Sequence, residues 1–91
     1  MNYQELLKSH RENFTKGGNP VFRSLCRRID ALAYSLTGEK VEGAKTIVVT
    51  KSTIVRAAAK IGFDFDGKFT VAAYESALEF LGNHILNPNQ V

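Results

Sequence analysis

Residues 45–62 read KTIVVTKSTIVRAAAKIG, and this stretch decides which fold class we expect. Within eighteen residues the apolar side chains change from the two-residue alternation of a strand to the spacing of an amphipathic helix. The alternation predicts a short strand over Thr46–Thr50, with Ile47 and Val49 on one face. No partner strand is evident in the chain, so an extended loop over residues 45–50 is the alternative. The stretch holds four cations and no acid, so both elements are expected to carry positive charge.

The helix that follows this strand is expected to begin at a cap on Thr50 or Ser52 and to end near Ile61, before Gly62. One face of it is apolar and is formed by Ile54, Val55, Ala58 and Ile61. Its outer face carries Arg56 and Lys60, which lie one turn apart.

Two helices are predicted before the strand. The first runs from Asn2 or Tyr3 to about Phe14 and has an apolar stripe formed by Tyr3, Leu6, Leu7, His10 and Phe14. The second runs from Pro20 to about Thr37, because Asn19 is a favourable N-cap and Pro20 suits the first helical position. Its apolar face is the widest in the chain and is formed by Val21, Phe22, Leu25, Ile29, Leu32, Ala33 and Leu36, with Cys26 on its flank.

A fourth helix is predicted from a cap at Thr70 to about Leu86, after a turn that reads FDFDGKF over residues 63–69. Its inward residues are Val71, Tyr74, Ala77, Leu78, Leu81 and Ile85. The fold class is therefore mainly α, four helices in the order α-α-β-α-α with one short β-strand. Ninety-one residues with 44% apolar side chains make a single domain, 1–91, with residues 86–91 as a loose tail.

The charge is divided unequally along the chain. Residues 1–62 hold eleven Lys and Arg against five Asp and Glu, a net of +6, whereas residues 63–91 hold one lysine against four acids, a net of −3. A basic body attracts phosphate groups or acidic protein surfaces. The predicted partner is nucleic acid, or a protein or nucleoprotein complex. The residues expected to bind it are Arg23, Arg27, Arg28, Lys45, Lys51, Arg56 and Lys60.

The sequence favours a binding protein over an enzyme. Asp64-Phe65-Asp66-Gly67 resembles a phosphatase nucleophile motif, but no hydrophobic strand precedes it. The single cysteine, Cys26, lies at an apolar helix position and is expected to be a packing residue. His10 lies on the apolar side of its helix and is expected to be a hydrogen-bonded histidine at the edge of the core. Histidine, cysteine and acid spacings predict neither a metal site nor a cofactor site. A lone cysteine, a polar N-terminus and no membrane-spanning run of apolar residues favour the cytoplasm, and no small-molecule substrate or membrane partner is expected.

Residues 45–86 resemble the ribbon-helix-helix repressors in the order of their elements: a short strand, a helix, a glycine-containing turn and a capped helix. In that family two chains pair their strands into a ribbon that enters the major groove. The resemblance implies a homodimer with Thr46, Val48 and Thr50 facing DNA. Ala58, Gly62 and Phe63 are also similar to the alanine and turn glycine of a helix-turn-helix motif, which is an alternative DNA-binding form.

A third class needs no nucleic acid. Size and character are similar to those of phage and mobile-element accessory proteins, including anti-CRISPR inhibitors, which act by occupying a surface of a host protein or nucleoprotein complex. Arginine and aromatic residues would then be the energetic hot spots. The two functional hypotheses are a dimeric DNA-binding regulator and a protein-directed inhibitor.

Overall fold

A computed structural model describes residues 3–12 and 20–87. These residues form the helices α1 (Tyr3–Arg11), α2 (Pro20–Thr37), α3 (Lys51–Lys60) and α4 (Val71–Leu86). The mainly helical fold is confirmed, and the predicted bounds of α2 and α4 agree with the structure. The helix α1 ends before the predicted Phe14, and Asn2, Phe14, Asn19 and the end of the predicted tail, residues 88–91, lie outside the described residues.

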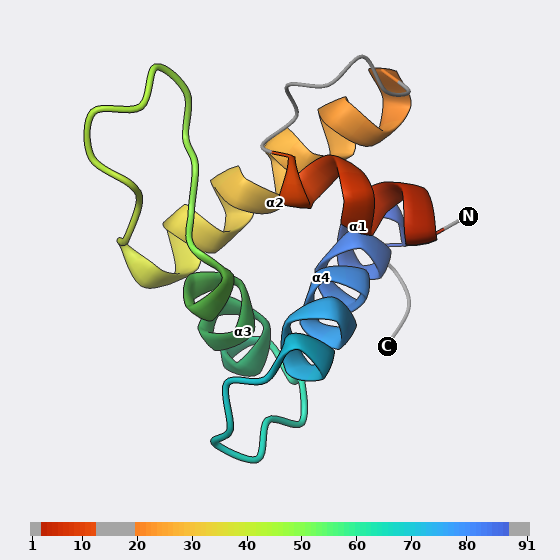
Figure 1. Cartoon of the computed structure of the whole chain (residues 1–91). Helices are drawn as coiled ribbons and strands as arrows, with labels where there is room; N and C mark the ends of the chain where they lie inside the picture. The colour runs from red at the N-terminus through yellow and green to blue at the C-terminus, as the bar shows by residue number, and fades with distance from the viewer. Residues whose placement is uncertain (1–2, 13–19, 88–91) are drawn as a thin grey trace.

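The four helices pack around one core. Figure 1 shows α3 and α4 side by side, with α2 running above them across the upper part of the view and α1 lying at the end of the molecule where α2 begins. The connection 38–50 extends away from the helices before it returns to α3, and the turn 61–70 lies at the opposite end from α1. None of the described helices is long and apolar enough to cross a membrane.

Hydroxyl caps explain where α3 and α4 begin. The Thr50 side chain accepts a hydrogen bond from the backbone N–H of Thr53, and the Thr70 side chain accepts one from Ala73. Each cap supplies an acceptor to a first-turn N–H that has no partner within its helix. Of the two caps that we considered for α3, Thr50 or Ser52, the structure therefore uses Thr50.

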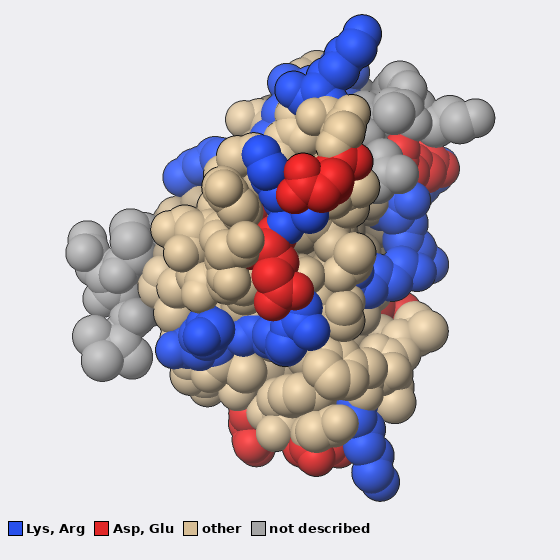
Figure 2. All heavy atoms as spheres, turned by 90° about the vertical axis from the view of Figure 1, so that its left-hand side faces the viewer, with Lys and Arg blue, Asp and Glu red and all other residues tan. Residues whose placement is uncertain are grey.

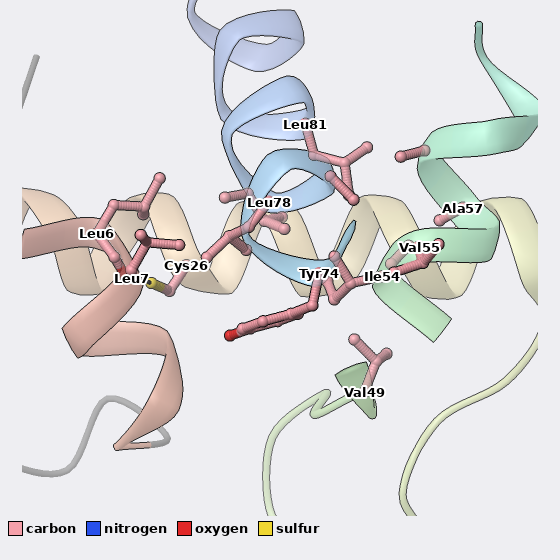
Figure 3. Close-up of a cluster of buried hydrophobic side chains, with 14 of the residues drawn as sticks. Leu6, Leu7, Cys26, Val49, Ile54, Val55, Ala57, Tyr74, Leu78 and Leu81 are labelled. Carbon is pink, nitrogen blue, oxygen red and sulfur yellow. Dashed lines mark hydrogen bonds between the residues drawn. The ribbon is translucent and has the colours of Figure 1, made fainter. Parts of the chain in front are cut away.

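The core is built from all four helices and from Val49 in the connection 38–50. Figure 3 shows the Tyr74 ring at its centre, with Leu6, Leu7 and Cys26 towards its hydroxyl end and Ile54, Val55 and Val49 towards the other end. Leu25, Ile29 and Ala33 of α2 are also buried. Cys26 is fully buried, so the prediction that it is a packing residue is confirmed.

The predicted strand Thr46–Thr50 is wrong as a strand, because the described residues contain no strand at all. The main-chain groups of this segment find other partners. The backbone N–H of Val49 donates to the Asp30 carboxylate at 3.1 Å, and the Val48 carbonyl accepts from the Val41 N–H at 2.7 Å. The alternation instead reflects one buried side chain, Val49, in an irregular segment.

Two residues predicted to face the core lie at the surface. Val21 is 65% exposed and Val71 is 64% exposed, although each continues the apolar spacing of its helix. Both belong to the first turn of a helix, Val21 in α2 and Val71 in α4. Periodicity shows which side of a helix is apolar, but it does not show where the neighbouring elements stop covering that side.

Candidate functional site

Three polar side chains from three helices form a buried network. His10 of α1 lies between the Asp30 carboxylate of α2, with Nε2 and Oδ1 2.7 Å apart, and the Tyr74 hydroxyl of α4, with Nδ1 and Oη 2.6 Å apart. The second oxygen of Asp30 accepts the N–H of Val49. His10 is 6% exposed, Asp30 0% and Tyr74 2%, so the network lies inside the protein.

The chemistry of this network is that of a cross-link within the fold. The Asp30 carboxylate accepts from Nε2–H of His10, and Nδ1 of His10 is hydrogen-bonded to the Tyr74 hydroxyl. Burial raises the pKa of the Tyr74 hydroxyl well above its ordinary value, chiefly by desolvation, so this group stays protonated at neutral pH. Hydrogen bonds join the side chains of α1, α2 and α4, and the connection 38–50 donates one more, from the Val49 N–H to Asp30. Together they fix how these four elements meet.

Of the two residues, His10 was predicted at its position and Asp30 was not. His10 was expected to be a hydrogen-bonded histidine at the edge of the core, and that is confirmed. Asp30 lies four residues after Cys26 and three before Ala33, so it belongs to the apolar face of α2. An acid on that face is the signal that could have identified a buried carboxylate.

Cys26 does not have the properties of a nucleophile. Its Sγ lies 3.8 Å from the Leu6 carbonyl oxygen, and burial raises the pKa of its thiol to about 12, with the charge of Asp30 acting in the same direction. The reactive form of cysteine is the thiolate, so this thiol is inert at neutral pH. No group of three potential metal ligands occurs in residues 3–12 and 20–87.

The arginines expected to bind a partner cluster in the N-terminal half of α2. Arg23 is half-buried, whereas Arg27 and Arg28 are exposed. Two hollows lie along this part of the helix. The first, which we call the arginine hollow, has a volume of about 240 Å³ and is lined by Pro20, Arg23, Ser24 and Arg27.

The second hollow adjoins the first, because they share Pro20 and Ser24. We call it the anchor hollow; its volume is about 350 Å³, and its lining residues are Pro20, Val21, Ser24, Leu25, Arg28 and Leu86. Leu86 is the last residue of α4, so this hollow lies where the end of α4 meets the start of α2. The two hollows place an apolar surface next to a cationic one.

The cations expected on and near α3 are separated from each other. Lys51 is the first residue of α3 and Lys60 the last, which places them roughly 14 Å apart along the axis. The Lys51 ammonium lies 5.4 Å from the centroid of the Tyr74 ring, and Lys45 is exposed in the connection 38–50. Arg56 Nη2 lies 2.5 Å from the Glu39 carboxylate, so its charge is compensated.

The predicted site residues therefore fall into different environments. Figure 1 shows α3 beside the C-terminal half of α2, away from the half that carries Arg23, Arg27 and Arg28. Figure 2 shows Lys and Arg side chains interspersed with Asp and Glu over the face that includes the connection 38–50. The three arginines of α2, in contrast, form no ion pair with any residue that the structure describes.

No protein-family model, curated protein or solved structure matches this chain.

Proposed function

We propose that the protein is a non-catalytic binding protein that acts by occupying a negatively charged surface of a macromolecule. The observation that carries this proposal is the charge on α2. This helix has three arginines and one acid, and the acid, Asp30, is fully buried in the network with His10. The arginines form no ion pair with a described residue, so their charge is available to a partner.

The absence of a catalytic role is part of the same proposal. Four groups that could serve acid–base or nucleophilic chemistry, His10, Asp30, Tyr74 and Cys26, are each at most 6% exposed. The raised pKa values of Tyr74 and Cys26 keep both groups protonated at neutral pH. Their positions support a role in holding the fold together, which leaves the surface to carry the function.

The proposal does not use the ribbon or the helix-turn-helix form of DNA binding. A ribbon requires main-chain groups of residues 46–50 to pair with a second chain, but the Val49 N–H donates to Asp30 and the Val48 carbonyl accepts from Val41. A helix-turn-helix has a turn of three or four residues. Ten residues, 61–70, separate α3 from α4. Contact through the arginines of α2 needs neither motif.

Covering a surface of a partner blocks whatever that surface does, so the role that we propose is that of an inhibitor or regulator. Arginine suits it, because its planar guanidinium forms two parallel hydrogen bonds with a carboxylate or phosphate and loses less hydration energy than lysine does. Such residues are enriched among the few that dominate interface energies.

Charge reversal tests this function. The variant Arg27→Glu/Arg28→Glu changes two exposed residues of α2, and Lys45→Glu/Lys60→Glu makes the same change in charge at two exposed residues elsewhere. Binding to polyglutamate and to a mixed-sequence DNA duplex is measured by fluorescence anisotropy at low and moderate salt. We expect the α2 variant to lose binding to whichever probe the wild type binds, and the matched control to keep most of it. Equal binding by both variants would contradict the proposal.

A further inference from the structure

The anchor hollow is lined by exposed apolar side chains from two helices. Val21 is 65% exposed and Leu86 is 42% exposed, and both line the same hollow with the buried Leu25. Single exposed apolar side chains are ordinary on protein surfaces. Two such side chains from different helices around one concave site are the arrangement in which a partner's apolar side chain is buried.

The arginines next to this hollow limit the chemistry of what it can receive. Arg28 lines the anchor hollow itself, and Arg27 lines the arginine hollow on the other side of the shared residues Pro20 and Ser24. An apolar group that enters the hollow therefore lies close to two exposed guanidinium groups. A partner that brings acidic groups on both sides of an apolar one would complement the charge and the apolar surface together.

We propose that the partner is a protein segment with acidic residues, which places one apolar side chain in the anchor hollow and its carboxylates against Arg27 and Arg28. This inference rests on the function proposed above and makes it more specific. The volume of about 350 Å³ has room for one large aliphatic or aromatic side chain. The walls formed by Val21, Leu25 and Leu86 offer such a side chain the burial that stabilises binding.

A protein segment fits these observations better than nucleic acid does. Phosphates could bind the arginines. The binding of a nucleic acid backbone is dominated by phosphate contacts, however, and would bury no apolar group against the exposed Val21 and Leu86. An acidic segment with an apolar residue uses both hollows. The two kinds of partner can therefore be distinguished by Val21, because its substitution should weaken binding of a protein segment but not binding of a nucleic acid.

The experiment begins with a library of displayed random peptides that is selected on the immobilised full-length protein. We expect the enriched peptides to combine several acidic residues with one large apolar residue. Synthetic versions of an enriched peptide are then compared by fluorescence anisotropy, with its apolar residue replaced by alanine in one version and its acids replaced by glutamine in another. Each replacement should weaken binding about tenfold or more.

The structure offers closely matched variants of the protein for the same assay. Val21→Ser changes a residue of the anchor hollow that is 65% exposed, and Val71→Ser changes a residue outside it that is 64% exposed. Both valines lie in the first turn of a helix, so both variants are expected to fold, which circular dichroism verifies. We expect Val21→Ser to weaken binding of the peptide about tenfold and Val71→Ser to leave it within about twofold.

The outcomes separate this inference from the function on which it rests. If Arg27→Glu/Arg28→Glu abolishes binding but Val21→Ser and Val71→Ser both bind as the wild type does, the proposed role of the anchor hollow is contradicted. The proposed contact through the arginines is then retained. Binding that survives the arginine changes as well would overturn both. Enrichment of peptides without acids, or displacement of the peptide by mixed-sequence DNA combined with insensitivity to Val21→Ser, would also overturn the acidic protein segment as the partner.

Discussion

His10 and Asp30 are twenty residues apart in the chain, and their side chains meet in the interior with Nε2 and Oδ1 2.7 Å apart. This contact joins α1 to α2. The helix α1 has only nine residues, and a helix of that length is marginal in water without tertiary contacts. Leu6 and Leu7 supply apolar burial, while His10 determines which way α1 faces, because its two ring nitrogens reach α2 and α4.

Replacing Asp30 with alanine should therefore be strongly destabilising. His10 Nε2 and the Val49 N–H would both lose this acceptor inside the core. Each buried hydrogen-bond donor that is left without a partner costs about 1–3 kcal/mol of the free energy of unfolding. Urea denaturation of Asp30→Ala, and of the milder Asp30→Asn, measures this cost. Asp64→Ala, at an exposed acid, is the control, and a loss from Asp30→Ala no larger than that of the control would show that the network is dispensable.

The hydroxyl of Tyr74 can be tested separately from its ring. Tyr74→Phe keeps the aromatic packing at the centre of the core and removes the group that lies 2.6 Å from His10 Nδ1. The loss of a buried hydrogen-bond partner should cost about 1–3 kcal/mol. Tyr34→Phe, at a half-buried ring beneath Lys40, provides the comparison and should change stability by less than about 0.5 kcal/mol. Equal melting temperatures for the two variants would disprove a role for the hydroxyl.

Two apolar residues of α2 that look equivalent in the sequence should differ greatly in their contribution to stability. Ile29 is fully buried and Val21 is 65% exposed. Ile29→Ala should lower the free energy of unfolding by about 2–5 kcal/mol, because it leaves a cavity in the core. Val21→Ala should change it by no more than about 0.5 kcal/mol. Thermal and urea denaturation measure both, and similar losses would mean that Val21 is covered in the folded protein.

Stability should fall at alkaline pH, because Cys26 is buried. The folded protein raises the pKa of its thiol to about 12 from an ordinary value of 9.0, so in the unfolded chain the thiol loses its proton first. The stabilising effect is fully present below pH 9 and is lost as the pH rises from 9 towards 12. Burial acts on Tyr74 in the same direction, starting near its ordinary value of 10.0.

Each group that ionises only on unfolding should lower the free energy of unfolding by up to about 1.4 kcal/mol per pH unit. Cys26→Ala should be less stable at neutral pH but should lose stability less steeply above pH 9 than the wild type does. Urea denaturation at a series of pH values gives both slopes. Parallel curves for the two proteins would show that the thiol does not contribute.

The helices could be predicted from the sequence because their signals are local. Pro20 at the first position, Gly38 after the last, and the repeat of apolar residues between them determine α2 without reference to the rest of the chain. Thr70 determines the start of α4 in the same way. Cys26 could be recognised as a core residue and His10 as a hydrogen-bonded one, because both lie on apolar helical faces.

The tertiary structure decided what happens at Val49, at Asp30 and at the ends of the helices. The alternation of apolar residues at 46–50 is compatible with a strand and with an irregular segment. Which of the two forms depends on whether the Val49 N–H donates to another strand or to the Asp30 carboxylate, and in the folded protein it donates to Asp30. The exposure of Val21 and Leu86 similarly depends on where the neighbouring elements end, and these exposed side chains line the anchor hollow. Local sequence determines which conformations a segment prefers, but burial and hydrogen-bond partners come from residues far away in the chain, and these exist only once the helices have packed.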